Sequence, residues 1–458
     1  MADVKPFRGI HYDTGRVGDL TRVVAPPYDV LSPEEQDALH RRHPRNIVWI
    51  DFGKTRDGDG PGSNKYTRAA TWFREWQAEG TLVRDAAPAL YYYEQEFTIP
   101  GKGTFVRKGF LGALKLSAFG EGVVFPHERT LAKPKEDRLA LMRATDAHMS
   151  PIFGLYSDPG NEVIARLRAG RASSPDLSAV DDLGVKHRVW TVTQPKAILG
   201  AVETMADKGV FIADGHHRYE TALAFREEMR SKHGVHPGAA YEHVLMFLCN
   251  MDDEGIVILP THRGIHSVPD FSADAFLAKV RAHLPVETRD GSPEDAMRAV
   301  EAAGRIGKAI AWSTGGNRFH LATFPDLPGF TDRHLAKFPP QLRPLDVVLL
   351  HGYLFEQLLG ISPEAVTAGQ FVKYYKDPAK ATGDIASGAI QAAFFLNPVT
   401  VAEFRDVSLS GQNPVTVAEF RDVSLSGHVL PQKTTFFYPK IGTGLLILSV
   451  TGDDRVPG

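Results

Sequence analysis

The stretch GVFIADGHHRYETA, residues 209–222, decides how this chain is interpreted. Its apolar first half predicts a buried strand, and Asp214-Gly215 predicts a tight turn at the end of that strand. Beyond the turn, apolar side chains recur near a period of 3.6, and Gly234 follows as a stop signal. The sequence therefore predicts a strand, a turn and a helix over 214–232, with Asp214 and Gly215 at the helix N-terminus.

A helix N-terminus is suited to binding phosphate, because backbone N–H groups and the positive end of the helix dipole gather there. Arg218 is placed to add a planar guanidinium, and Asp214 to hold a metal ion or accept a proton. Asp-Gly before a helix is also ordinary capping chemistry, and His216, His217 and Arg218 are compatible with a solvated first turn. Cations at this end oppose the dipole unless an anion compensates them, which favours a phosphate site.

A second group of polar residues lies upstream, in FPHERT (residues 125–130) and KPKEDR (residues 133–138). His127 and Glu128 are candidate acid/base residues, and Lys135 and Arg138 are candidate phosphate-binding cations. Phosphoryl transfer uses such groups to hold phosphate oxygens and to move a proton. On its own, a charged run beside a helix is usually a solvated face.

Composition limits the classes of function. The chain has 458 residues, of which 43% are apolar and 10% aromatic, and a formal charge of -3, so packed cores are expected and a role on nucleic acid is disfavoured. No apolar run approaches the roughly 20 residues that span a bilayer, so no membrane partner is expected and the cytoplasm is the default location. A small-molecule substrate is favoured. The single cysteine, Cys249, lies in an apolar run and is expected to be a buried thiol.

Alternating helix and strand patterns indicate a mixed α/β or α+β fold. The expected helices cover 33–40, 66–79, 135–148, 214–232, 273–282 and 293–303, and the expected strands cover 89–97, 105–116, 189–192, 209–213, 241–250 and 256–259. Residues 169–182 are expected to form a loop. A division into a nucleotide-binding region, residues 1–235, and a C-terminal α/β region, residues 236–458, is predicted at the Gly- and Pro-containing segment around residue 236.

A tandem duplication lies near the C-terminus: residues 397–411 (NPVTVAEFRDVSLSG) recur unchanged as residues 413–427. Repeat architectures need several units to bury a core, so two identical copies indicate a recent duplication instead. One copy is expected to be structurally redundant, with the extra unit forming a loop or lengthening a helix before Pro431.

Gly53-Lys54-Thr55 resembles the end of a phosphate-binding P-loop. The motif requires glycine where this chain has Val48, and the usual helix does not follow. The match is therefore interpreted as chance.

Several motifs together carry a resemblance to a known family: APPYDV (25–30), HERT (127–130), SPIF (150–153), ADGHHRYETA (213–222), LPTHR (259–263) and PQK (431–433). In this combination the chain resembles the uncharacterised bacterial and archaeal family called domain of unknown function ten-fifteen, over nearly its whole length. The Asp-Gly-His-His-Arg segment also looks like the phosphate motif of the ParB and sulfiredoxin superfamily, which includes free-serine kinases that use ADP or ATP.

The resemblance implies a ParB/sulfiredoxin-like core in which Gly215, His216, His217 and Arg218 hold nucleotide phosphates and Asp214 acts on the acceptor hydroxyl. The serine kinases also use a carboxylate from their N-terminal part, for which Asp29 is the candidate here. The catalytic cysteine of sulfiredoxins is replaced by histidine in this chain, and we see no basic recognition helix of the ParB type.

Three functions follow from these observations. The first is a magnesium-dependent phosphotransferase on a small hydroxyl metabolite, with free L-serine as acceptor and ATP or ADP as donor. The second is a phosphoester hydrolase, such as a phosphoserine phosphatase. The third is a switch without catalysis, in which a bound nucleotide only orders the helix terminus.

Overall fold

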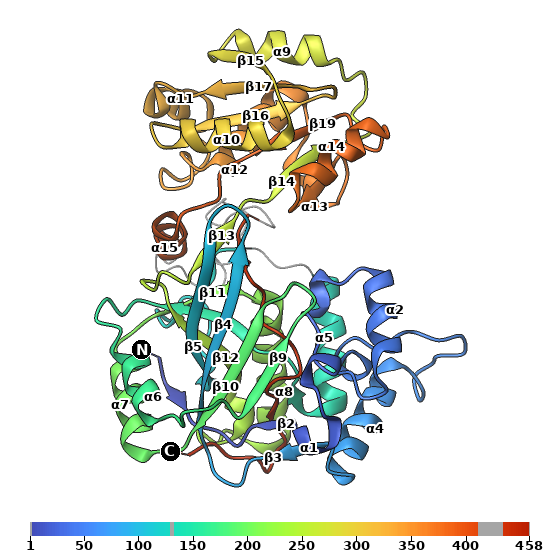
Figure 1. The fold of residues 1–458 in the computed structure, drawn as a ribbon, viewed down its shortest axis with the longest axis vertical. Helices are drawn as coiled ribbons and strands as arrows, with labels where there is room; N and C mark the ends of the chain where they lie inside the picture. The colour runs from blue at the N-terminus through green and yellow to red at the C-terminus, as the bar shows by residue number, and fades with distance from the viewer. Residues whose placement is uncertain (1, 129–131, 411–433, 458) are drawn as a thin grey trace. The chain divides into compact units, whose positions relative to one another are not determined.

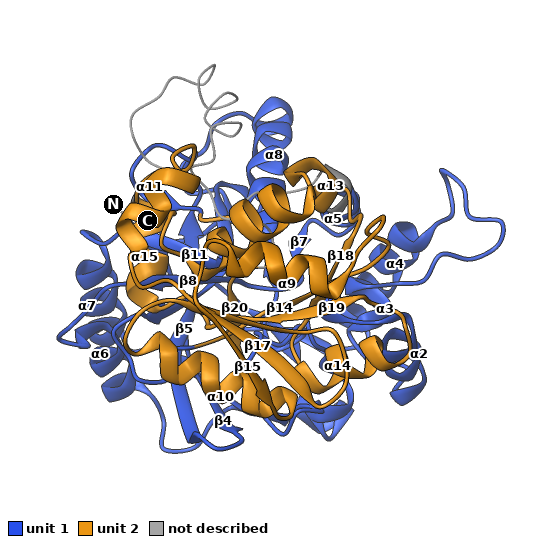
Figure 2. Cartoon of the chain, turned by 90° about the horizontal axis from the view of Figure 1, so that it is seen from above, with its two compact units in different colours: residues 1–126, 130–257, 439–458 blue, residues 127–129, 258–438 orange. Residues whose placement is uncertain are grey.

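The computed structural model of the chain describes residues 2–128, 132–410 and 434–457. They form two compact units, each of which is built from discontinuous segments. Unit 1 comprises residues 1–126, 130–257 and 439–458, and unit 2 comprises residues 127–129 and 258–438; Figure 2 colours them separately. The prediction of a mixed α/β fold is confirmed.

Unit 1 is organised around a nine-stranded mixed sheet with the order β6-β11-β8-β12-β5-β4-β10-β9, in which β1 pairs with β5. Its strands are β1 (Val4–Lys5), β4 (Leu90–Ile99), β5 (Gly103–Lys115), β6 (Val124–Phe125), β8 (Ile152–Tyr156), β9 (Leu177–Val180), β10 (Lys186–Val192), β11 (Val210–Asp214) and β12 (His243–Asn250). β12 runs parallel to β8 and antiparallel to β5. Every residue of β12 is buried, which explains the apolar run from Val244 to Cys249.

Helices pack against this sheet, and among them α6 and α7 lie side by side, with α6 in contact with β4 and β5 and α7 in contact with β1 (Figure 1). The helices of unit 1 are α1 (Thr14–Val17), α2 (Pro33–Arg42), α3 (Val48–Asp51), α4 (Lys65–Ala78), α5 (Ala132–Thr145), α6 (Glu162–Gly170), α7 (Pro195–Met205) and α8 (His216–His233), with 3-10 turns η1 (Leu20–Arg22), η2 (Tyr28–Val30) and η3 (Ala240–Glu242). Two small sheets pair β2 (Ile10–Tyr12) with β3 (Leu82–Arg84), and β7 (Ala147–His148) with β21 (Leu448–Ser449). Helix α5 packs against both α4 and α8.

Unit 2 contains a six-stranded sheet with the order β15-β17-β16-β19-β14-β18, and the pair β13-β20. The strands are β13 (Val257–Leu259), β14 (His262–Ile265), β15 (Val286–Asp290), β16 (Ala309–Ser313), β17 (Arg318–Thr323), β18 (Val372–Tyr375), β19 (Ala392–Phe395) and β20 (Phe436–Tyr438). The helices are α9 (Ala273–Arg281), α10 (Pro293–Gly304), α11 (Leu327–His334), α12 (Asp346–Val348), η4 (Leu349–Leu358, a π-helix), α13 (Pro363–Thr367), α14 (Pro378–Ala386) and α15 (Val401–Ser410).

The six-stranded sheet of unit 2 has a hydrophobic core on each of its two faces. Ile310 and Trp312 of β16 belong to the cluster that contains Phe276 of α9. Ala309 and Ala311 belong to the cluster that contains Val300 of α10. Because strand side chains alternate with a period of two, both faces of this sheet are covered by helices.

The compact units divide the chain differently from the predicted boundary at residues 235–236. β12 lies between β8 and β5, and the segment 439–458 returns to unit 1, where β21 pairs with β7. A boundary at residue 236 would separate the centre of the sheet from its neighbours. In this part of the sequence the chain passes from unit 1 to unit 2 between residues 257 and 258, because the pairing of β12 keeps it in unit 1.

Two local predictions also differ from the structure. The expected loop 169–182 contains the strand β9, which pairs with β10 at the sheet edge and presents only Leu177 and Ala179 to the interior. The helix expected to reach His148 ends at Thr145, because Asp146 takes a positive φ of 46° and the chain then forms β7. Other expected elements are confirmed, among them the helix α2 and the strands β4 and β5, which pair as a hairpin.

The first copy of the duplicated sequence forms α15, which Thr400 and Glu403 cap reciprocally through bonds of 2.9 and 3.1 Å. Phe404 and Val407 of this copy are buried. The second copy, residues 413–427, lies outside the described residues, as does Pro431. Among the helices that the structure describes, none is long and apolar enough to cross a membrane.

Candidate functional site

The strand, turn and helix predicted around Asp214 are confirmed. β11 ends at Asp214, Gly215 occupies the N-cap position with a φ of 97°, and α8 begins at His216. An added Cβ at Gly215 would lie 3.1 Å from the Arg218 guanidinium, so both the backbone angle and the side-chain packing require glycine here. No side chain at the N-cap bonds to the helix, and its first turn carries no acidic residue.

Asp214 lies between two cations. Lys440 Nζ donates to Asp214 Oδ1, and Arg218 Nη2 donates to Oδ2 at 2.8 Å. Burial raises the pKa of Asp214, but the charges of Lys440 and Arg218 outweigh burial and lower that pKa to about 2. The carboxylate is therefore ionised at neutral pH, and its negative charge lies next to the positive end of α8.

Arg218 is a buried cation, and both terminal nitrogens of its guanidinium already donate hydrogen bonds within the protein. One terminal nitrogen donates to Asp214, and the other donates to the carbonyl of Pro151, in the loop before β8. A guanidinium has five N–H donors, so these bonds leave others for an anion. Arg218 thus fixes the position of Asp214 and adds positive charge to the site.

The two histidines that open α8 differ in exposure. His216 is buried, whereas His217 is half-buried. Burial lowers the pKa of His217. The negative charges of Glu220 and Asp29 raise this pKa in part, and the positive charge of Lys135 lowers it. His217 is thus a neutral imidazole at pH 7, and it lies near Asp29 and Lys135, both of which are candidates from the sequence.

Lys135 and Arg138 of α5 are both engaged by carboxylates. Lys135 Nζ lies 2.6 Å from Glu220 Oε2. Arg138 is buried, donates to Asp51 Oδ1 at 3.1 Å and to Asp137 Oδ2 at 2.6 Å, and lies 3.9 Å from the centre of the Tyr28 ring. Arg138 is therefore a structural cation that joins α5 to the N-terminal segment, and not an exposed phosphate ligand.

A small cavity of about 30 Å³ adjoins Arg218. It is lined by Asp51, Arg138, Leu141, Met142, Ala147, His148, Met149, Ser150, Arg218 and Thr221. This volume holds one or two water molecules, because a cavity of roughly 10–15 Å³ holds one. It connects the Arg138 cluster to the N-terminus of α8.

His127 and Glu128 belong to unit 2, whereas Asp214 belongs to unit 1. The His127 ring is fully buried, its Nε2 bonds with Thr435 Oγ1 at 2.7 Å, and its edge meets the Phe404 ring. The structure brings together Asp29, Lys135 and residues 214–218 in unit 1, and it does not bring His127 and Glu128 into that unit.

Three residues of this site were missed by sequence reasoning: Lys440, Asp51 and Arg107. Lys440 lies in PKIGTG (439–444), where a single cation among glycines and apolar residues was the available signal. Arg107 is fully buried on β5, 4.6 Å from the Phe153 ring centre, and its Nη1 has no hydrogen-bond partner among the described residues. Burial lowers the pKa of Arg107 to about 10, against the charge of Asp214, which raises it. The available signal was an arginine in a largely apolar strand.

Within the described part of the chain, no three histidine, cysteine, aspartate or glutamate side chains are grouped to hold a metal ion. Magnesium usually takes one or two carboxylates and completes its shell with water and substrate phosphates. The ionised Asp214 fits such a site as a single protein ligand. Cys249, in contrast, is inert: burial raises the pKa of its thiol, and Sγ donates to the Lys108 carbonyl at 2.8 Å.

The fold and the site define a mixed α/β protein with an anion-compatible strand, turn and helix, in which an ionised aspartate is flanked by two cations. The chain belongs to the family described as protein of unknown function (DUF1015), whose model matches residues 4–348. No curated protein matches the chain.

The solved structures that are similar to this chain include the following three, each with a TM-score of 0.32. A conserved hypothetical protein from Pyrococcus furiosus is 14% identical, with 72% of this chain and 93% of that chain covered. A mutant free serine kinase in complex with ADP is 12% identical, with 70% and 88% covered. SbnI with a C-terminal truncation, from Staphylococcus aureus, is 13% identical, with 75% and 90% covered. Similarities of this size carry no argument about the activity of this chain.

Proposed function

We propose that the protein is a nucleotide-dependent phosphotransferase that acts on a small hydroxyl metabolite, with free L-serine as acceptor and ATP or ADP as donor. The observation that carries the proposal is the ionised Asp214 held between Lys440 and Arg218 at the N-terminus of α8. Phosphoryl transfer depends on positioning and on stabilising negative charge, and these groups supply both.

The nucleotide phosphates would bind at the start of α8, where Gly215 lets the backbone approach closely and the helix dipole favours an anion. Lys440 and Arg218 would stabilise the charge on the oxygens of the transferred phosphoryl group. Binding would also rearrange the contacts of Asp214, because both cations now bond to its carboxylate. The bound phosphates would compete with Asp214 for the same donors.

In the transfer step, the serine hydroxyl oxygen would form a bond to the terminal phosphorus while the bond from that phosphorus to the nucleotide oxygen breaks. The hydroxyl proton would pass to a base in the site. His217 is a neutral imidazole near Asp29, so it can accept this proton, and Asp214 is a second candidate once phosphate has drawn away its cations. Asp29 would then stabilise the protonated imidazole.

Magnesium would be held by Asp214, and when bound it would neutralise part of the phosphate charge. Each carboxylate oxygen has more than one lone pair, so Asp214 can keep a protein contact beside the metal. Lys135 and Arg138 would act indirectly, because Glu220, Asp51 and Asp137 already occupy them.

The test is a phosphorus NMR time course with purified protein, magnesium and L-serine, run with ATP, with ADP, and with phosphoserine alone. A phosphomonoester signal that requires nucleotide supports the proposal. Phosphate released from phosphoserine alone would favour a hydrolase, and nucleotide binding without turnover would favour a switch. Asp214→Asn keeps the side-chain size and removes the charge, so it should abolish turnover; Lys102→Met, at the exposed tip of the β4-β5 hairpin, is the matched control.

A further inference from the structure

A cavity of about 150 Å³ lies in the N-terminal helical part of unit 1, between α2, α3, α4 and the loop before α4. None of the residues proposed to act in phosphoryl transfer lines it. Its walls include the aromatic rings of His40, Trp49 and Trp72, and its polar lining comes from Gly53-Lys54-Thr55 and nearby basic residues. A cavity of this volume can enclose one benzene-sized ring.

The aromatic wall is continuous. The His40 and Trp49 rings meet edge to face with centroids 4.4 Å apart, and Trp49 and Trp72 do so at 5.1 Å. His40 is only 9% exposed, and the backbone of Phe52 is its one polar contact among the described residues. Because buried polar atoms are nearly always satisfied, and this contact can engage only one ring nitrogen, the second nitrogen at the wall of the cavity indicates a missing partner inside it.

The basic side chains give the cavity its charge. Lys54, Arg56, Lys65 and Arg68 line it, and no carboxylate is among its lining residues. Arg68 pairs with Asp59, which lies outside the lining, at 2.6 Å.

The remaining cations differ in their partners. Lys54 pairs with Asp37, and Lys65 with Asp137 at 2.5 Å, and both carboxylates also lie outside the lining. No described carboxylate forms an ion pair with Arg56. An anion in the cavity would therefore meet cations without meeting a lining carboxylate.

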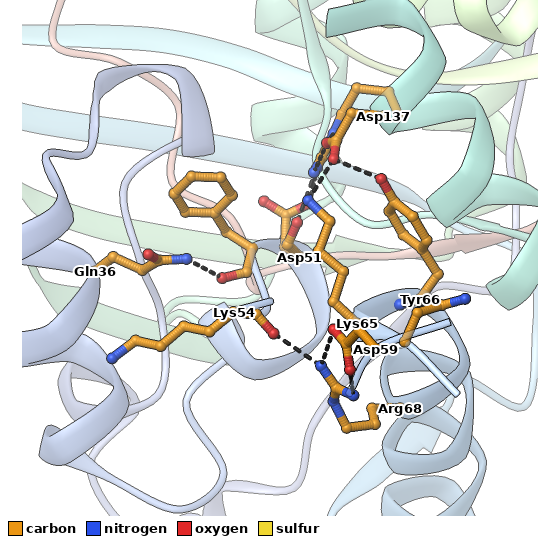
Figure 3. A network of polar contacts seen from close by, with 11 residues as sticks. Gln36, Asp51, Lys54, Asp59, Lys65, Tyr66, Arg68 and Asp137 are labelled. Atoms are coloured by element: carbon orange, nitrogen blue, oxygen red, sulfur yellow. Dashed lines mark hydrogen bonds and ion pairs between the residues drawn. The ribbon is translucent and has the colours of Figure 1, made fainter. Parts of the chain in front are cut away.

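The loop that carries Lys54 and Arg56 is held in place before any ligand binds. Arg68 donates to the Lys54 carbonyl at 2.9 Å, and the Arg56 backbone N–H donates to Asp59 Oδ2 at 3.0 Å. Figure 3 shows Arg68 joining the loop and Asp59, with Lys65 and Tyr66 both directed at Asp137. A site whose loop is already ordered loses less entropy on binding.

We propose that this cavity binds a small planar anion: one aromatic or heteroaromatic ring that carries a carboxylate or a phosphate group. The ring would pack against Trp49 and Trp72, and its polar edge or substituent would bond to His40. The anionic group would lie toward Lys54 and Arg56. Burial lowers the pKa of His40, and the charge of Lys54 lowers it further, while the contact with the Phe52 backbone raises it in part, so the imidazole is neutral and keeps one ring nitrogen for the ligand.

The experiment titrates the full chain with phenyl phosphate and with benzoate by isothermal titration calorimetry. Benzyl alcohol supplies the ring without charge, and inorganic phosphate supplies the charge without a ring. At least one planar anion should bind with a Kd of about 1 mM or tighter. Benzyl alcohol and inorganic phosphate should each bind at least about tenfold more weakly, since each lacks one of the two interactions.

Variants locate the binding. The double variant Lys54→Met, Arg56→Met should bind the planar anion about tenfold more weakly, or weaker still, because two charge-assisted contacts are lost. His40→Phe, which keeps a ring and removes both nitrogens, should also weaken it, whereas Lys102→Met should not. Circular dichroism confirms that each variant is folded.

Absence of binding by both planar anions would overturn the proposal. So would equal affinity in wild type and in the Lys54, Arg56 double variant, because binding would then occur elsewhere, for example at α8. Inorganic phosphate that binds as tightly as phenyl phosphate, and is weakened as much by the Lys54, Arg56 double variant, would overturn the role of the aromatic wall. None of these outcomes depends on phosphotransferase activity, so this proposal and the proposed function fail separately.

Discussion

Lys440 donates a hydrogen bond to Oδ1 of Asp214, although 226 positions separate the two residues. Both side chains are mostly buried. Segment 439–458, which follows unit 2 in sequence, thus supplies a cation to the N-terminus of α8 in unit 1. The pair links the fold to the site, because the chain must return to unit 1 to bring Lys440 next to Asp214.

Replacement of Lys440 tests this link. Lys440→Met leaves Asp214 buried with Arg218 as its remaining bonded cation, so the pKa of Asp214 should rise and the folded state should lose about 3 kcal/mol of stability. Urea denaturation at pH 7 measures this loss. Lys440→Arg keeps the charge and should recover part of the stability. Equal unfolding midpoints for wild type and Lys440→Met would show that the pair contributes nothing to folding.

A second prediction concerns pH and His148, which lines the small cavity beside Arg218. Burial lowers the pKa of His148 to about 4, although its bond with the His243 carbonyl raises that pKa in part. Between pH 6.5 and 4 the unfolded chain therefore binds a proton that the folded chain does not. The contribution of His148 to the free energy of unfolding is therefore fully present above pH 6.5, and it is lost as the pH decreases toward 4.

The measurement is urea unfolding of wild type and His148→Gln at pH 7.5 and pH 5. Wild type should lose about 2 kcal/mol more stability than the variant between these two values, because glutamine does not titrate. Identical pH dependence in both proteins would contradict a buried neutral His148.

Local pattern was enough to predict the parts of the site that are contiguous in sequence. β11, Gly215 and α8 follow one another, and their apolar periodicity and turn chemistry reflect the local backbone directly. The same holds for the β4-β5 hairpin. Arg218 was predicted at the correct place, but its bonds to Asp214 and to the Pro151 carbonyl use donors that the sequence pattern had assigned to a phosphate.

Long-range contacts could not be predicted in this way. Nothing near Lys440 or Asp51 in the sequence indicates that they approach α8 or α5, because their pairing depends on sheet order and on the return of segment 439–458. His127 was grouped with Lys135 because they are close in sequence, yet the chain changes compact unit between residues 126 and 127. Proximity in sequence was a poor guide where the chain crosses between units.

A third prediction concerns Gly215. Gly215→Ala must place a Cβ 3.1 Å from the Arg218 guanidinium at a φ of 97°, so it should cost about 1–3 kcal/mol of stability and displace Arg218 from Asp214. Gly120→Ala is the matched control, since Gly120 has a φ of 95° and no atom lies within 4 Å of the position that a Cβ would take there. The Gly120→Ala variant therefore introduces backbone strain without a side-chain clash. The free energy of unfolding, measured by urea denaturation, and the turnover rate should both fall more in Gly215→Ala than in Gly120→Ala. Equal losses in the two variants would show that the Arg218 contact has no role.

The duplicated segment gives the fourth prediction. The first copy forms α15 and buries Phe404, whose ring meets Phe437 at 5.1 Å, while Glu403 pairs with Lys308 at 2.9 Å. Because this copy already fills its place in the unit 2 core, deletion of residues 412–427 should leave the fold intact. The deleted chain should express in soluble form and match wild type in its circular dichroism spectrum and unfolding midpoint. Phe404→Ala, in contrast, should cost about 3–5 kcal/mol, as expected for a buried phenylalanine. Insoluble expression of the deletion variant would show that the second copy is not redundant, and that the core of unit 2 needs both.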